Sequence, residues 1–385
     1  MAEVTNYIDR LVAELCPDGV EYRPLGELLG YEQPTKYLVS SKDYDDSYPT
    51  PVLTAGKTFI LGYTNETEGI YPASKEEPVI IFDDFTTAFK WVEFPFKAKS
   101  SAMKMLTLKS GNNSLFKYVY YAMQCIVYNS SDHARQWISK YSNIEVPVPP
   151  LEIQEAIVEI LDKFTNLEAE LEAELEARTL QYGYYRNSLF EALDCPRVPL
   201  GSLGTRNKGI AITASKMRTL EPGNKDVRIF AAGSTFVDTD SSFIPDKGIL
   251  EGPAIIVKSR GHIGFEYYEG RFTHKNELWS YSLTSNLVEQ KFIYYYLLTQ
   301  AYSLHELARG KSVKLPQLAV KDTDELLVPV PSLEEQQRIV DILDRFDALT
   351  SSLSEGLPAE LAARRSQYEY YRDQLLTFPR KGENQ

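Results

Sequence analysis

One segment of this chain occurs twice, and this internal repeat constrains the fold more than any other feature of the sequence. Residues 146–164 align with residues 328–346 at a constant offset of 182, and 13 of the 19 aligned positions are identical. The match resumes between residues 181–186 and 367–372 at an offset of 186, so the second copy carries four additional residues. A repeat of this size indicates one supersecondary unit that is used twice.

Both copies have the pattern of a long amphipathic helix. Pro149 and Pro331 precede the expected helix starts, where the missing backbone N–H costs nothing. Apolar residues then recur at three- and four-residue spacing, which places them on one stripe. Two stripes of this length in one chain bury each other most readily as a coiled coil. We therefore expect a coiled coil that includes Phe164, Leu167, Leu171 and Leu175 of the first copy and Phe346, Leu349, Leu353 and Leu361 of the second.

The second copy differs from the first by its four additional residues. We expect these residues to supply one more leucine step, which keeps the stripe nearly in phase. Gly356 and Pro358 should nevertheless break or kink the second helix locally. If the two copies are related by a pseudo-twofold axis, their helices run antiparallel. The alternative is that each stripe packs separately into its own globular domain.

The beginning of the chain resembles the trailing end of a repeat. Residues 5–28 contain a short amphipathic helix, a Cys-Pro pair and a Pro-Leu-Gly-x-Leu segment, and residues 189–203 contain the same series. The duplication is therefore circular, which predicts that the two termini lie close together.

Two unlike globular blocks, residues 17–145 and 196–327, are separated by the repeats. In each block short β-rich runs alternate with turns and lead to an aromatic helical run. The Tyr-rich runs in these helices are expected to pack in the core. We predict an α+β fold with two globular α+β domains separated by two long helices in an antiparallel coiled coil, with a pseudo-twofold, circular repeat. The expected domains are residues 1–16 as a helix that completes the circular repeat, 17–145 as the first block, 146–195 as the central helix, 196–327 as the second block and 328–385 as the C-terminal helix.

The charge of the chain is unevenly distributed. The net charge of −13 at first argues against a nucleic-acid partner, but residues 146–195 alone carry −8, whereas residues 196–327 carry +3. The distribution of the field, and not the net charge, decides binding. The acidic helix face fits protein docking better than contact with phosphates, or it is a solvated charged face.

Composition also bounds the cellular setting and the chemistry. No apolar run approaches 18 residues, so we expect a soluble, cytoplasmic protein without a membrane partner. The three cysteines form no C-x-x-C pair and the four histidines show no ligand spacing, so no metal site is predicted. Asp83-Asp84 is expected to serve as a turn or hydrogen-bond acceptor and not as a metal ligand.

Motifs for catalysis are incomplete. Residues 54–58 and 309–312 end in Gly-Lys-Thr and Gly-Lys-Ser, but Pro51 and His305 stand where a phosphate-binding loop needs its first glycine. A possible metal-nuclease pattern near Glu251 lacks its lysine, because Pro253 stands there. We therefore predict no catalytic residues and no cofactor in this chain.

Polar and basic loops remain as candidates for DNA recognition. Lysine and arginine mixed with serine, threonine and asparagine suit phosphate contact and base-edge reading, although surface loops often have this composition. The candidates in the first block are Thr54, Lys57, Thr58, Thr86, Thr87, Lys90, Trp91, Lys99, Ser100, Ser101 and Lys104. Those in the second block are Lys258, Ser259, Arg260, His262, Lys275, Asn276, Arg309, Lys311 and Lys314.

Taken together, these motifs resemble the specificity subunit of type I restriction–modification enzymes. The V-P-V-P-x-L-E-x-Q segments at 146–154 and 328–336, and the Q-Y-x-Y-Y-R segments that follow, are similar to the conserved regions of this family. Segments within the first block, at residues 51–58, 80–87 and 99–104, resemble its target-recognition domains. The Leu-Glu-Ala-Glu tandem after Leu167 is similar to the spacer tetrapeptides of the IC subfamily.

The resemblance implies a non-catalytic DNA-recognition subunit. Each block would read one half of a bipartite, asymmetric site in double-stranded DNA, and the helices would set the spacing and dock two methyltransferase subunits. Those subunits would bring S-adenosylmethionine for methylation of adenine N6, and restriction/translocase subunits would use ATP and Mg for cleavage. The alternatives are a recognition subunit of another modification or defence enzyme, such as a type IIB-like assembly, and a structural coiled-coil adaptor without a DNA role.

Overall fold

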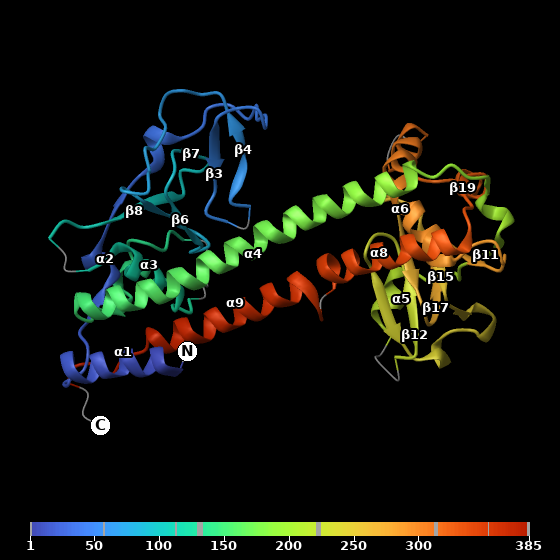
Figure 1. The fold of residues 1–385 in the computed structure, drawn as a ribbon. Coiled ribbons are helices and arrows are strands. Elements are labelled where there is room, and N and C mark those ends of the chain that lie inside the picture. The colour runs from blue at the N-terminus through green and yellow to red at the C-terminus, as the bar shows by residue number, and fades with distance from the viewer. Residues whose placement is uncertain are drawn as a thin grey trace. The chain divides into compact units, whose positions relative to one another are not determined.

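The computed structural model describes residues 2–56, 58–111, 114–128, 134–220, 225–311, 315–352 and 354–382. The chain divides into two compact units. The first unit comprises Met1–Glu170 and Leu361–Gln385, and the second comprises Leu171–Glu360. Each unit contains one globular block and segments of the repeat helices, which Figure 1 labels α4, α8 and α9.

The two copies of the repeat form helices of different continuity. Helix α4 runs without interruption from Leu151 to Glu191, a length of about 60 Å at 1.5 Å per residue. The second copy forms α8 (Leu333–Ser351) and α9 (Gly356–Leu375). Helix α8 is capped by Ser332, whose side chain accepts a hydrogen bond from the N–H of Glu335 at 3.3 Å.

The predicted break near Gly356 is confirmed, and it lies in the part of the repeat that carries the four additional residues. Gly356 has φ +76°, and a Cβ there would lie 2.5 Å from the backbone oxygen of Ala348. Four residues separate the end of α8 at Ser351 from the start of α9 at Gly356. The predicted extra leucine step stays a prediction, because Leu353 lies outside the described residues.

The block of the first unit contains two sheets and one main helix. The larger sheet is antiparallel with the order β2 (Leu29–Glu32), β8 (Met103–Leu108), β5 (Val79–Asp83) and β6 (Phe89–Val92). The smaller sheet has the order β4 (Ile60–Thr64), β3 (Thr50–Leu53) and β7 (Lys97–Ala98), with β3 and β7 parallel. Helix α3 (Phe116–Gln124) follows, and α1 (Ala2–Leu15), α2 (Leu25–Leu28) and the ribbon of β1 (Tyr22–Pro24) with β9 (Glu145–Pro147) complete the unit.

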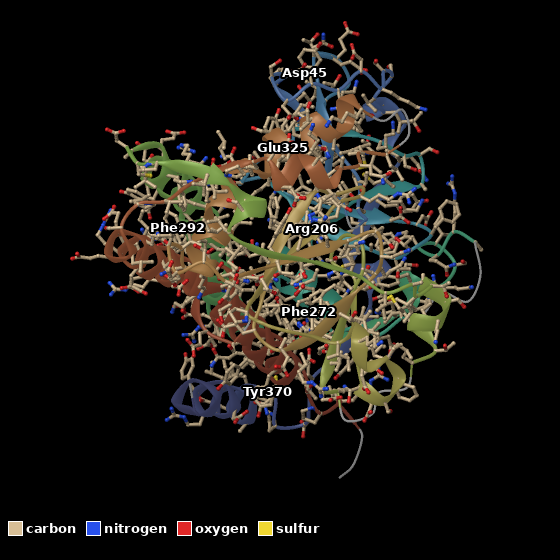
Figure 2. The ribbon with its side chains drawn as sticks, turned by 90° about the vertical axis from the view of Figure 1, so that its right-hand side faces the viewer. Asp45, Arg206, Phe272, Phe292, Glu325 and Tyr370 are labelled. Carbon is tan, nitrogen blue, oxygen red and sulfur yellow. The ribbon has the colours of Figure 1, made fainter. Side chains whose placement is uncertain are left out.

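The block of the second unit repeats this plan. The antiparallel sheet has the order β11 (Gly204–Lys208), β18 (Trp279–Leu283), β15 (Ala254–Lys258) and β16 (Gly264–Tyr268). The other sheet has the order β13 (Phe236–Thr239), β12 (Val227–Phe230), β17 (Arg271–His274) and β14 (Leu250–Glu251), with β12 and β17 parallel. Figure 2 labels Arg206 on β11 and Phe272 on β17. Helices α5 (Ala214–Arg218), α6 (Gln290–Gly310) and α7 (Val320–Asp324) and the ribbon of β10 (Arg197–Pro199) with β19 (Leu327–Pro329) complete the unit.

Each unit contains an antiparallel helix pair with aromatic rings at its contact. In the first unit the ring of Phe164 in α4 lies 5.8 Å from that of Tyr371 in α9, while Glu168, further along α4, pairs with Arg365, which is earlier in α9. In the second unit the ring of Phe346 in α8 lies 6.2 Å from Tyr182 and 5.8 Å from Tyr185 of α4. These ring contacts agree with the predicted antiparallel coiled coil, in which Phe164 and Phe346 take part.

The leucines of the predicted seam differ in burial. Leu361 is buried, Leu167, Leu171 and Leu175 are half-buried, and Leu349 is 36% exposed. Leu353 lies outside the described residues. Burial therefore does not separate the aromatic rings from the leucines: Tyr182 is buried like Leu361, Phe164, Phe346 and Tyr371 are half-buried, and Tyr185 is exposed.

Segments from the two ends of the chain pack together inside the first unit, as the circular repeat predicts. Val20 forms a β-bridge with Arg380, and the hydroxyl of Tyr22 donates to the backbone oxygen of Phe378 at 2.9 Å. Ile8 belongs to the same core cluster as Leu375. Within the part of the chain that the structure describes, no helix has the length and apolar character needed to cross a membrane.

Candidate nucleic-acid interface

Three loops of the first block lie side by side at the ends of its central strands. The N–H of Lys99 donates to the backbone oxygen of Leu53 at 3.0 Å, which joins loop 99–102 to loop 54–58. The N–H of Asp84 donates to the backbone oxygen of Ala102 at 3.0 Å, which joins the same loop to loop 83–88. We call these three loops the first loop cluster; many of the polar candidates of the first block lie on it.

The loops of this cluster are shaped by their own side chains. Asp83 Oδ1 accepts hydrogen bonds from the N–H of Phe85 at 3.0 Å and from the N–H of Thr86 at 2.8 Å. Thr87 then adopts the left-handed backbone conformation, with φ 59°. The hydroxyl of Thr54 donates to the backbone oxygen of Thr58 at 2.6 Å. The role predicted for Asp83, a hydrogen-bond acceptor in a turn, is confirmed.

A buried ion pair lies beneath the first loop cluster. Lys104 Nζ is 3.0 Å from Asp84 Oδ2, and the side chains are 0% and 1% exposed. Asp84 Oδ1 also accepts the N–H of Trp137 at 2.8 Å. The prediction that Lys104 belongs to an exposed DNA-reading loop was wrong, because it lies on strand β8 and faces the interior. The pair connects strand β8, which carries Lys104, to the loop that carries Asp84.

Equivalent loops converge in the second block. The N–H of Lys275 donates to the backbone oxygen of Phe230 at 3.0 Å, and the N–H of Leu318 donates to the backbone oxygen of Ser259 at 2.9 Å. The N–H of Gly261 donates to the backbone oxygen of Pro316, also at 2.9 Å. We call residues 231–235, 258–263, 275–277 and 315–318 the second loop cluster.

Two of the predicted contacts of this block support the cluster from inside. Lys258 is 5% exposed; its Nζ lies 3.0 Å from Glu266 Oε2 and donates to the backbone oxygen of Ala231 at 3.2 Å. Ser259 is also buried, and its hydroxyl donates to the backbone oxygen of Glu277. The expectation that these two side chains lie on the surface of the loop was wrong. The hairpin after β15 presents Arg260 and His262 instead, and both are exposed.

The remaining candidates fall into three groups. The exposed ones are Thr58, Thr86, Lys90, Ser101, Asn276, Arg309 and Lys311. The half-buried ones are Thr54, Thr87, Trp91, Lys99, Ser100 and Lys275. Lys57 and Lys314 lie outside the described residues. These positions stay predictions of DNA contact.

Three of these candidates make side-chain contacts with residues of helices. The Trp91 ring packs 4.9 Å from Phe116 and 5.4 Å from Tyr120 of helix α3, with Lys117 Nζ 4.4 Å from its centre. Lys311 Nζ lies 2.5 Å from Asp322 Oδ1. Arg309, at the end of α6, lies 3.8 Å from Glu306, one turn earlier. Trp91 therefore serves mainly to pack the sheet against its helix.

Residues 231–235 of the second loop cluster were not among the DNA contacts predicted from the sequence. Residues 54–59 read Thr-Ala-Gly-Lys-Thr-Phe, and residues 231–236 read Ala-Ala-Gly-Ser-Thr-Phe. Both segments leave the strand that pairs in parallel with its neighbour, and both close with a backbone hydrogen bond of 2.9 Å, from Thr54 N–H to Phe59 and from Ala231 N–H to Thr235. The shared Ala-Gly-x-Thr-Phe pattern could have identified this loop from the sequence.

The described residues show no group of three or more histidine, cysteine, aspartate or glutamate side chains placed to hold a metal ion. One buried titratable group lies behind the second cluster. His274 is buried on β17, its Nε2 lies 3.2 Å from Ser280 Oγ, and burial lowers the pKa of its imidazole.

Two blocks of one fold, each with a polar loop cluster, are the arrangement expected of a protein that recognises DNA through two domains. The comparisons with known proteins agree with this class. The family model described as type I restriction modification DNA specificity domain matches residues 17–177 and 200–363. The chain belongs to this family.

Individual relatives cover nearly all of the chain. The type I restriction enzyme EcoR124I/EcoR124II specificity subunit of Escherichia coli is 43% identical over 406 residues, which cover 97% of this chain and 98% of the relative. A putative type I restriction enzyme specificity subunit of Haemophilus influenzae is 27% identical, with 93% and 96% covered. The crystal structure of a type I restriction–modification S subunit from M. genitalium matches with a TM-score of 0.57 at 17% identity and covers 93% of this chain and 96% of that one. This structural likeness concerns the fold.

Proposed function

We propose that this chain is a non-catalytic subunit that recognises a bipartite, asymmetric sequence in double-stranded DNA, each block reading one half. The observation that carries the proposal is the duplication of one loop cluster on one fold with different side chains. The hairpin after β5 presents Thr86, whereas the equivalent hairpin after β15 presents Arg260 and His262. Because different side chains prefer different base edges, the two half-sites should differ in sequence.

The contacts in each block would combine reading with positioning. Arg260 carries a planar guanidinium that suits guanine O6 and N7 or a phosphate. The exposed hydroxyls of Thr58, Thr86 and Ser101 can reach phosphates or base edges. The buried pair of Lys104 with Asp84 and the buried Lys258 would keep these loops in shape before DNA arrives, which reduces the entropic cost of binding.

We propose that α4 helps to set the distance between the half-sites. Its 41 residues form one helix that begins in one unit and ends in the other. A helix is a stiff element whose length is fixed by its residue count. The assignment to the IC-like subfamily rests on the resemblance of the Leu-Glu-Ala-Glu tandem in α4 to the spacer tetrapeptides of that subfamily, and it stays a prediction.

The helices also carry features of a docking surface. Leu151 and Leu333 occupy equivalent repeat positions and are 40% and 54% exposed, and Tyr184 and Tyr370 are equivalent and 70% and 58% exposed (Figure 2 labels Tyr370). Most other identical positions of the repeat are buried or half-buried. Large apolar side chains kept twice on the surface favour two copies of one partner.

We propose that this partner is a DNA methyltransferase subunit. Two such subunits would dock on the equivalent surfaces, and the acidic face of α4 favours a basic partner over phosphates. S-adenosylmethionine would bind to these partners, and ATP and Mg to restriction/translocase subunits, with all of this taking place in the cytoplasm. The chain itself would contribute recognition.

The test is reconstitution with methyltransferase subunits from a type I system, followed by mapping of methylated adenines. We expect methylation at two unlike half-sites separated by a fixed gap, and weak, unspecific DNA binding by the chain alone. A palindromic or continuous target, or tight specific binding without the partner, would overturn the proposal. Arg260→Ala distinguishes a structural adaptor, for which this variant would be harmless, from a DNA reader, for which it reduces methylation.

A further inference from the structure

A buried glutamine of each repeat holds the start of the block's main helix. Gln154 and Gln336 are both 0% exposed. The side-chain oxygen of Gln154 accepts the N–H of Leu115, which precedes α3, and that of Gln336 accepts the N–H of Glu289, which precedes α6, at 2.8 Å in both cases. Each amide nitrogen also donates to the proline two residues before its own helix, at 2.7 and 2.9 Å. The same side chain therefore ties block to helix twice.

An aspartate eight residues further along the repeat helix makes a second connection. In the second unit the hydroxyl of Tyr295 donates to Asp344 Oδ1 at 2.5 Å, and Lys291 Nζ lies 2.7 Å from Asp344 Oδ2. Burial, together with the hydrogen bond to Asp344, raises the pKa of the Tyr295 phenol, so the hydroxyl stays protonated as the donor.

The first unit repeats this arrangement. Tyr121 donates its hydroxyl to Asp162 Oδ1, and Lys117 Nζ lies 4.0 Å from the same atom. The lysine and tyrosine are four residues apart on α3 as on α6, and both pairs are related by an offset of 174, while glutamine and aspartate keep the offset of 182. We call the glutamine, aspartate, lysine and tyrosine of each unit its anchor.

We propose that the anchors position the two blocks for DNA recognition. An anchor fixes its block at two points of one helix, about 12 Å apart at 1.5 Å per residue. Two such points oppose both sliding and rocking of the block, so the loop cluster keeps one place and one direction relative to the helix of its own unit. This inference rests on the proposed function, and it makes Asp162, Asp344 and their partners positioning residues that determine which gap between half-sites is accepted.

The experiment uses the complex with methyltransferase subunits and DNA that carries the same half-sites with the native gap or with one base pair more or less. Asp344→Ala and the milder Tyr295→Phe should lower the preference for the native gap by about tenfold, the ratio expected for one lost hydrogen bond to a charged group. The half-site sequences should stay the same. Asp162→Ala and Tyr121→Phe should act in the same way through the first block.

Controls separate positioning from folding. Asp347→Ala, an exposed change on the same helix, should keep the native preference. The exchange Lys291→Asp with Asp344→Lys should restore preference that Asp344→Ala loses, because it rebuilds the ion pair in reverse. If the wild-type complex methylates its bipartite site and folded Tyr295→Phe and Asp344→Ala keep the same gap preference, the anchor inference fails. If the wild-type complex recognises no bipartite site, the proposed function fails instead.

Discussion

Lys104 and Asp84 form a fully buried ion pair beneath the first loop cluster, with 3.0 Å between Nζ and Oδ2. Removing one member leaves the other charge buried without its partner. We expect Lys104→Ala to lower the free energy of unfolding by about 3 kcal/mol or more. Urea denaturation measures this loss. Replacing both residues, as in Lys104→Met with Asp84→Leu, should recover part of it; a larger loss in the double variant would contradict the account.

Arg260 provides the matched surface case. Its side chain is exposed, so Arg260→Ala should change the free energy of unfolding by less than about 0.5 kcal/mol. Methylation by the complex should fall, because the proposed DNA contact is lost. The two variants together separate a loss of DNA reading from a loss of stability, which Lys104→Ala or a change at Lys258 alone cannot do.

The buried glutamines should matter for stability in both units. Gln336→Ala leaves the N–H of Glu289 without its acceptor, and we expect a cost of about 1–3 kcal/mol. Gln154→Ala should behave alike for Leu115. Gln337→Ala is the control, because this neighbour is exposed and, among the described residues, donates a hydrogen bond to Asp341 of its own helix. Equal melting temperatures for Gln336→Ala and Gln337→Ala would refute the role of the glutamine.

The linker between α8 and α9 requires a glycine at position 356. Gly356→Ala forces a side chain into the left-handed conformation with its Cβ 2.5 Å from a backbone oxygen, so we expect a loss of more than about 1 kcal/mol. Gly183→Ala is the opposite case, because Gly183 lies inside α4 with nothing within 4 Å of the added Cβ. That change should stabilise the protein by about 0.5–1 kcal/mol. Thermal unfolding of the two variants should show shifts of opposite sign.

His274 should make the second block sensitive to acid. Burial lowers the pKa of its imidazole below the ordinary value of a histidine, so the unfolded chain binds a proton before the folded chain does. Stability should therefore decrease as the pH falls below about 6.5 and stop changing below the folded pKa. Urea midpoints at pH 7.5 and 5.5 should differ less in His274→Gln than in the wild type. An identical pH dependence of both proteins would exclude this role.

Lengthening α4 tests its role in spacing. One more Leu-Glu-Ala-Glu after Leu171 adds roughly 6 Å to the helix, against about 3.4 Å for each base pair. We expect the methylated sites to show a changed gap and the same two half-sites. An unchanged gap would count against this role. As the companion experiment, exchange of residues 17–145 for another such block should change one half-site only.

The repeat made much of the fold predictable. Identical residues such as Phe164 and Phe346 pack at equivalent points, and Gly356 breaks the second copy as its backbone preference demands. The closeness of the terminal segments followed from the circular order of the motifs. The exact ends of the two helices, Ser351 and Gly356, could not be read from the spacing of the leucines.

The candidate site was predicted less well, because loop residues were selected by type alone. A lysine on a strand can face the interior when it pairs with a carboxylate, as Lys104 and Lys258 do. Composition does not show in which direction a side chain points. The sequence contains the lysines of the two anchors, Lys117 and Lys291, at an offset of 174. It does not show that they pair with Asp162 and Asp344, which are distant along the chain.

The interruption between α8 and α9 bears on how such proteins diversify. If α4 sets the spacing as proposed, a duplicated tetrapeptide in α4 needs no simultaneous duplication in the second copy, because that copy is already divided between Ser351 and Gly356. A single slippage event during replication of the tandem Leu-Glu-Ala-Glu codons would then be enough to give a bacterium a new target without altering either reader.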